Sequence, residues 1–219
     1  VTTHGRGYVE ISDALNALTR QEGATLFMTL MAGFYALLHR YTGQTDMAIG
    51  TPIANRRQGE LEPLIGLFIN TLVLRASVDG HMTFRQLLRR VKETALEGYA
   101  HQDLPFEMIV DALQPERDMS HSTLFQVMFI LQNAGQNTGQ NVGAQSAPSQ
   151  GLALKMIEVD AGTSTFDLTL NVTEQPTGLS VSVEYNTDIF DRATMQRLLG
   201  HFERLLTAAA DAPDAKIGQ

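Results

Sequence analysis

Two kinds of hydrophobic spacing alternate along this chain and predict a layered α/β domain. Helical spacing of three and four residues predicts helices over residues 12–22, 25–43, 83–99, 105–113 and 191–210. Apolar runs or alternating apolar and polar residues predict strands over residues 47–54, 68–78, 124–131, 152–159, 166–173 and 179–185, with a short extended segment at 8–11. This order of helices and strands favours one α/β domain with a mixed β-sheet packed with helices.

Residues at the helix ends support these boundaries. Thr25 and Thr83 are of the type that accepts hydrogen bonds from the first free backbone N–H groups of a helix. Gly43 fits the left-handed conformation in which many helices end. Pro105 suits the first position of the 105–113 helix, and we expect Asp103 to cap that helix.

The segment from residue 47 to residue 75 contains residues that a strand buried in a core does not need. Pro52 cannot donate to a sheet, so it indicates an edge, a bulge or a strand end. Gly50 and Gly66 allow close approach of the backbone to another group. The simplest interpretation is two core strands joined by a charged loop. The alternative is the wall of a binding channel, or a seam with another lobe.

Composition excludes several classes of function. The chain has 219 residues, 43% of them hydrophobic and 18% charged, as in ordinary globular proteins. Its formal net charge is -8 and no basic run exceeds two residues, so we expect no nucleic-acid partner. It has no cysteine and no apolar stretch that approaches the ~20 residues of a membrane span, so we expect no membrane partner. Residues 133–151 are uncharged and rich in Gln, Asn, Gly and Ser, which predicts a flexible low-complexity loop.

Candidate chemistry is sparse. None of the six histidines has the spacing of a metal site, and no G-x-S-x-G or glycine-rich phosphate loop is present. His101 is of a type that acts as a general base near neutral pH. The simpler interpretation of this region is a helix start that Asp103 and Glu107 favour. The residues alone therefore assign no reaction.

Five segments, in chain order, resemble signature segments of the condensation domains of nonribosomal peptide synthetases. They are residues 49–56 (IGTPIANR), 65–71 (IGLFINT, followed by Arg75), 101–107 (HQDLPFE), 117–126 (RDMSHSTLFQ) and 165–168 (TFDL). One such segment is weak evidence, whereas five in order are specific, and the resemblance covers essentially the whole chain.

This resemblance implies a fold like that of chloramphenicol acetyltransferase, with two similar α/β lobes and a tunnel between them. Donor and acceptor carrier proteins bring thioesters to the tunnel on 4'-phosphopantetheine arms, and the acceptor amine attacks the donor thioester. The family's H-H-x-x-x-D-G motif, whose second His works at the amine, lies in the first lobe and is absent here. Residues 1–219 therefore resemble the C-terminal lobe, and the opening without Met indicates a fragment. We expect the isolated lobe to be catalytically inactive.

The resemblance also implies partners and residue roles. The partners would be the first lobe, the two carrier proteins and an adenylation domain, in the cytoplasm, with no cofactor bound directly. Arg56 would reach the Asp of the missing motif and support the active site. Four polar residues would line the tunnel: Asn70, Thr71, Thr163 and Ser164. Two residues would lie where the acceptor carrier protein approaches: Tyr99 and His101.

Other hypotheses remain open. An epimerisation domain is a relative with the same lobes, although the segment 101–107 argues for condensation. A non-catalytic docking module for carrier proteins would suit the absent His pair, whereas the chain is too short for a stand-alone coenzyme A acyltransferase. The donor and acceptor amino acids cannot be assigned from one lobe. We also expect an exposed apolar surface near Asn70 and Phe166, where a missing partner would pack.

Overall fold

The computed structural model describes residues 2–9, 13–55, 59–61, 63–114, 124–132, 163–175 and 178–218. The strands are β1 (Thr2–Val9), β2 (Asp46–Ile53), β3 (Asn70–Ser77), β4 (Val127–Gln132), β5 (Leu168–Gln175) and β6 (Gly178–Asn186). The helices are α1 (Asp13–Gln21), α2 (Leu26–Thr42), α3 (Phe84–Ala100), α4 (Phe106–Leu113) and α5 (Arg192–Asp211), with a 3-10 turn, η1, at Gly59–Leu61.

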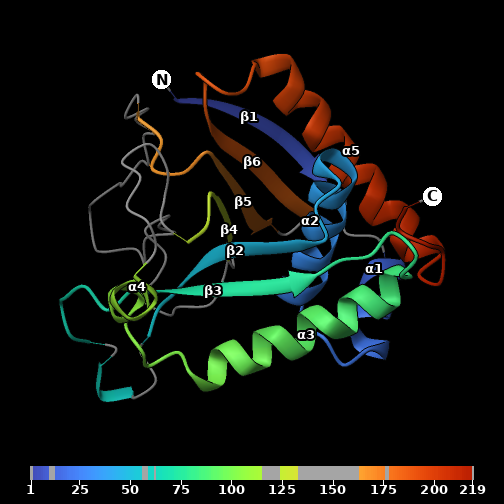
Figure 1. Cartoon of the computed structure of the whole chain (residues 1–219). Helices are drawn as coiled ribbons and strands as arrows, with labels where there is room; N and C mark the ends of the chain where they lie inside the picture. Colours follow the sequence, from blue (N-terminus) through green and yellow to red (C-terminus); the bar gives the residue numbers. More distant parts are fainter. Residues whose placement is uncertain are drawn as a thin grey trace, which may run out of the picture.

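The six strands form one mixed sheet in the order β1-β6-β5-β4-β2-β3 (Figure 1). The pairs β1–β6, β6–β5 and β2–β3 are antiparallel, whereas β5–β4 and β4–β2 are parallel. In the described residues, β2 and β4 pair only at Gly50 and Met128. The sheet is therefore loosely joined at the centre of the strand that carries Gly50.

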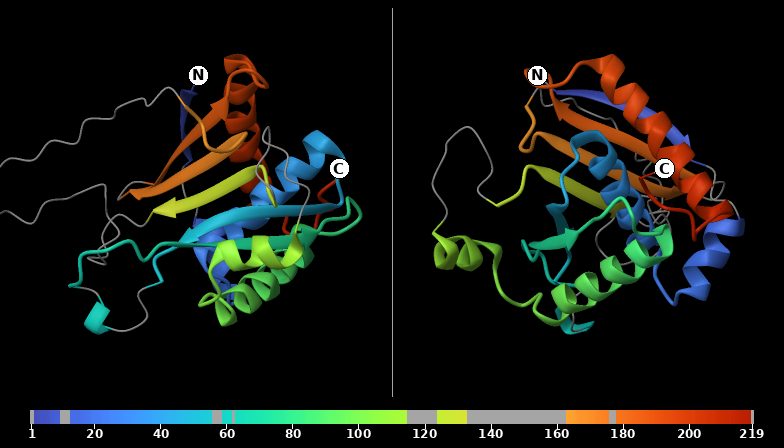
Figure 2. Two further views of the ribbon diagram at one scale, coloured as in Figure 1. Left: turned by 60° about the vertical axis from the view of Figure 1, so that its left-hand side comes forward. Right: turned by 45° about the vertical axis from the view of Figure 1, so that its right-hand side comes forward.

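Helices α2 and α5 lie over one face of the sheet, and α3 runs beside the edge strand β3 (Figures 1 and 2). Nearly all of α2 is buried, because apolar residues occur all around it rather than on one stripe. The hydroxyl of its Tyr35 donates a 2.6 Å hydrogen bond to the Leu74 carbonyl of β3, which satisfies a polar group in the core. Burial raises the pKa of Tyr35 well above its usual value.

Most of the predicted boundaries are confirmed. Thr25 and Thr83 cap α2 and α3, and Gly43 ends α2 with φ 70°. The prediction for Asp103 was wrong, since the N-cap of α4 is Pro105 and makes no side-chain hydrogen bond. The extended segment at 8–11 is instead the end of a longer strand, because β1 pairs with β6 over its whole length. The predicted strand 152–159 and the loop 133–151 lie outside the described residues.

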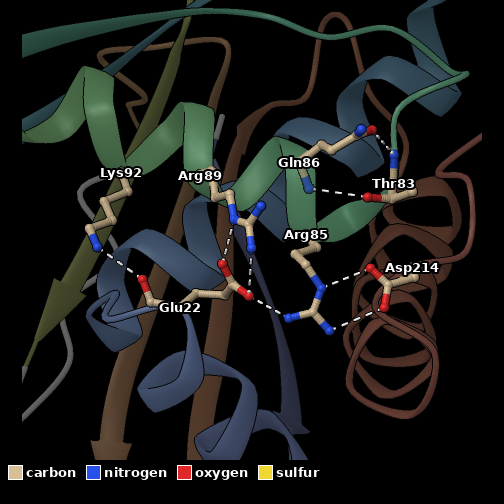
Figure 3. A network of polar contacts seen from close by, with 7 residues as sticks. All are labelled: Glu22, Thr83, Arg85, Gln86, Arg89, Lys92 and Asp214. Atoms are coloured by element: carbon tan, nitrogen blue, oxygen red, sulfur yellow. Dashed lines mark hydrogen bonds and ion pairs between the residues drawn. The ribbon is translucent and has the colours of Figure 1, made fainter.

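A network of charges fixes the C-terminal segment to the start of α3 (Figure 3). The carboxylate of Glu22, only 6% exposed, binds Arg85 and also accepts a 2.6 Å hydrogen bond from Arg89. Arg85 reaches on to Asp214 at 2.8 Å, and Lys92 donates to the Glu22 carbonyl at 2.9 Å. Arg89, and then Arg85, lower the pKa of Glu22 more than burial raises it.

Candidate functional site

The side chain of Asn70, the first residue of β3, holds the loop that precedes α4. Its Oδ1 accepts hydrogen bonds from the backbone N–H of Phe106 at 3.0 Å and of Thr71 at 2.9 Å. Its Nδ2 donates to the carbonyls of Gln102 at 2.9 Å and Leu104 at 2.8 Å. One amide therefore makes four hydrogen bonds and ties the strand to the 102–106 loop.

Asn70 also takes over the capping of α4. The first N–H groups of a helix have no partner within it, and Pro105 offers no side chain that could accept from them. Asn70 Oδ1 provides the acceptor for the N–H of Phe106, the first residue of that helix. The start of α4 is thus positioned from another strand rather than by its own sequence.

Three aromatic rings continue this arrangement. Phe125, just before β4, is 2% exposed and lies 5.7 Å from Phe106 between ring centroids, in an edge-to-face arrangement. On its other side it stacks on Phe166, which precedes β5, at 5.2 Å. A Cβ atom on Gly50 would overlap the ring of Phe125, so this position on β2 requires glycine. Such pairs contribute about 0.5–1.5 kcal/mol each beyond their burial.

Gly50, Asn70, Phe106, Phe125 and Phe166 together form what we call the motif cluster. Each comes from a different one of the five segments singled out in the sequence. Because successive residues of a strand point to opposite faces, Gly50 faces away from its buried neighbour Ile49, which belongs to the main core. The cluster therefore stands on the face of the sheet opposite that core.

An exposed apolar surface borders the motif cluster, and we call it the apolar rim. In the segment leading to β3 it comprises Leu64 (50% exposed), Ile65 (104%), Leu67 (89%) and Ile69 (61%). At and along α4 it comprises Leu104 (44%), Met108 (57%) and Leu113 (63%). Both parts meet at Asn70, which follows Ile69 and binds the Leu104 carbonyl, and α4 lies beside the start of β3 (Figure 1).

The sequence matches the family model of the Condensation domain over residues 9–219. This chain belongs to the condensation domain family. It is 50% identical over 210 residues to a linear gramicidin synthase of Brevibacillus parabrevis, and the match covers 95% of this chain but only 4% of that protein.

Solved structures of the family agree with the fold. A holo four-domain nonribosomal peptide synthetase bound to AMP and glycine superposes with a TM-score of 0.89 at 26% identity, over all of this chain and 17% of that one. The condensation domain of the monacolin K polyketide synthase MokA gives 0.82 at 23% identity, over 99% of this chain and 49% of that one. The expected fold, a mixed sheet with packed helices of the chloramphenicol acetyltransferase type, is thereby confirmed.

The polar residues predicted to line a tunnel lie close to the motif cluster. In this condensation domain chain, Thr71 is half-buried beside Asn70. Thr163 is exposed, whereas the Ser164 hydroxyl donates to the Phe166 carbonyl and so fixes the turn below that ring. Arg56, predicted to support the active site, lies outside the described residues.

The two residues predicted at a carrier-protein approach differ in their surroundings. Tyr99 is half-buried, with its ring 6.5 Å from that of Phe27, and burial raises its pKa. His101 is exposed at the C-terminal end of α3, where its N–H donates to the Gly98 carbonyl at 3.2 Å. Of the two, only His101 presents its side chain freely to the surface.

The motif cluster has no titratable side chain, since it consists of one glycine, one amide and three phenyl rings. In the described part of the chain, no group of acidic residues and histidines could hold a metal ion. Within the same residues, no helix is both long and apolar enough to cross a membrane. The site is therefore built for shape and for positioning the backbone, not for proton transfer.

Phe106 and Phe125 were not among the predicted site residues. Each stands inside a motif segment, so the signal was present, but a phenylalanine in an apolar context reads equally well as ordinary core. Only the contact with Gly50 distinguishes Phe125, because it joins residues that are 75 positions apart in the chain.

Proposed function

We propose that this chain is the second lobe of a condensation domain that forms peptide bonds between carrier-bound thioesters. The acceptor amine would attack the donor thioester carbon, so that a C–N bond forms, the C–S bond breaks and the phosphopantetheine thiol leaves. The His that assists the amine would come from the first lobe. The match over residues 9–219 and the coverage of half a solved condensation domain support this assignment.

The observation that carries the proposal is the apolar rim beside the motif cluster. Aliphatic side chains exposed this far and grouped together mark a surface that another protein segment covers. Burying each would contribute about 1.5–3 kcal/mol, so even a few of them provide enough free energy for association. The first lobe of the same domain is the partner that we assign to this surface.

Within this proposal, each predicted residue has a role. Arg56 would bind the Asp of the first lobe's motif in a bidentate pair and steady the active site. The tunnel wall would be formed by Asn70, Thr71, Thr163 and Ser164. His101 would face the acceptor carrier protein, and Tyr99 would support that surface from within.

The same proposal includes partners and location. Substrates would arrive on the 4'-phosphopantetheine of donor and acceptor carrier proteins, next to an adenylation domain and in the cytoplasm, with no cofactor bound directly to this lobe. Linear gramicidin synthase, a relative at 50% identity, is named as a synthase of a peptide product, which supports this context.

The test is reconstitution with the first lobe of the parent polypeptide. Mixed lobes should co-sediment and, with loaded carrier proteins, yield the dipeptidyl thioester by mass spectrometry, whereas this chain alone should yield none. Ile65→Asp with Leu67→Asp should abolish association, while Ile189→Asp, which changes an equally apolar side chain 50% exposed elsewhere, should not.

Three results would contradict the proposal. The chain could remain a compact monomer at high concentration beside the first lobe. The reconstituted pair could bind loaded carriers without forming product, which is the docking-module hypothesis. Inversion of the α-carbon of a carrier-bound residue, with no new peptide bond, would indicate an epimerisation domain.

A further inference from the structure

A basic hollow lies between the C-terminal half of α2 and α5, with a volume of about 700 Å³. We call it the basic groove, with a floor of Leu37 and Leu205 and a border of Arg40, Arg197, His201 and Arg204. The floor is apolar, since Leu37 is 2% exposed and Leu205 is half-buried, while the four border side chains are exposed. None of these residues belongs to the five motif segments or to the apolar rim.

The border carries a charge opposite to that of the protein. The chain has a net charge of -8, yet three guanidinium groups gather here, and no carboxylate of the described residues lies within ion-pair distance of them. Arg197 donates to the Thr194 hydroxyl at 2.7 Å. Asp191 is the acid nearest in effect, but the N–H of Thr194 lowers its pKa more than the charge of Arg197 does.

The basic side chains on α5 follow the repeat of a helix. Arg197, His201 and Arg204 stand at i, i+4 and i+7, so they share one face of α5 and span about 10 Å along it. Like charges at these spacings destabilise an isolated helix. The stripe therefore does nothing for the fold of this chain, and its repeat matches the spacing of side chains along a second helix.

Contact between the two helices holds the groove in shape. The Tyr41 hydroxyl and His201 Nδ1 share a 2.8 Å hydrogen bond, with ring centroids 5.9 Å apart. Burial raises the pKa of Tyr41, and the neighbouring charge of Arg197 opposes that rise. Because Tyr41 comes from α2 and His201 from α5, the border is braced before any ligand binds.

We infer that the basic groove binds an acidic, amphipathic helix of a partner protein. Carboxylates on one face of that helix would pair with Arg197, Arg204 and Arg40, and an adjoining aliphatic side chain would contact the Leu37 and Leu205 floor. A purely inorganic anion would use the charges but not the floor, so the mixed lining favours a protein segment. The groove lies on the α2–α5 side, away from α4 and the apolar rim (Figures 1 and 2), so both surfaces can be occupied together.

The test is fluorescence anisotropy with the full chain and a labelled helical peptide that carries Glu at i, i+4 and i+7 beside Leu residues. Binding should weaken with salt and fall about tenfold or more when the peptide's Glu residues become Gln. Arg197→Glu with Arg204→Glu should cause a similar loss. Arg20→Glu with Arg192→Glu, which changes the net charge equally at exposed positions outside the groove, should leave binding unchanged.

Folding of the variants is checked by circular dichroism, and Arg197→Gln with Arg204→Gln provides a milder pair that should still weaken binding. Equal binding of the Glu and Gln peptides would overturn the inference, as would equal loss in the two charge-reversal pairs. Tighter binding of inorganic polyphosphate than of the Glu peptide would show that the groove recognises phosphate rather than a helix.

Discussion

Asn70→Ala removes one side chain and four hydrogen bonds at once. A typical hydrogen bond contributes about 0.5–1.5 kcal/mol, and because Asn70 is half-buried, water can replace part of what is lost. We therefore expect the 102–106 loop and the start of α4 to lose roughly 2–4 kcal/mol of local stability. Since the loop lies outside the main core, the global unfolding free energy should change less than this.

Hydrogen exchange followed by mass spectrometry measures this local effect. Peptides covering residues 101–113 should exchange roughly 30- to 1000-fold faster in Asn70→Ala, as the free energy implies. Peptides of α2 should change little. Asn171→Ala is the matched control, since Asn171 is also a half-buried strand asparagine and makes no side-chain hydrogen bond with the described residues.

Asn70→Asp divides the role of the amide into two parts. The carboxylate still accepts from Phe106 and Thr71, but it can no longer donate to the Gln102 and Leu104 carbonyls and instead repels them. Exchange should then rise at 102–104 and stay slow at the start of α4. If Asn70→Ala left exchange at 101–113 unchanged but reduced product formation in the reconstituted domain, Asn70 would act on the substrate directly, and the positioning argument would be refuted.

Two further changes test the packing and the charge network. Gly50→Ala should cost about 1–3 kcal/mol by displacing Phe125, while Gly200→Ala, with open space around it on α5, should stabilise by about 0.5–1 kcal/mol; thermal unfolding compares them. Glu22→Gln should destabilise the chain by about 1–3 kcal/mol at neutral pH, since Arg85 keeps Asp214 as a partner. Because the pKa of Glu22 is lowered in the fold, this gap should close as pH falls through that lowered pKa; denaturant unfolding that gave one gap at pH 7 and about pH 3 would contradict it.

Local signals in the sequence predicted the helices and strands well. Thr25 and Gly43 define α2 because capping depends on residues within one turn of the helix end. The prediction failed for α4, where a nearby Asp103 was chosen and the acceptor comes from Asn70, 36 residues earlier. No local pattern contains that information, because it depends on where β3 lies relative to the loop.

The same distinction explains why the motifs were recognisable although no reaction could be derived from them. Each segment contributes one residue to the motif cluster, and those residues act through shape: a glycine that admits a ring, an amide that ties a loop, and three rings that pack together. These requirements are strict, so they leave a clear trace in the sequence, but none of them moves a proton or attacks a carbonyl. If the catalytic His belongs to another lobe, as we propose, a positioning change such as Gly50→Ala should lower product formation in the reconstituted domain without altering its pH profile. A shifted pH profile would instead place a titrating group of the reaction within this chain.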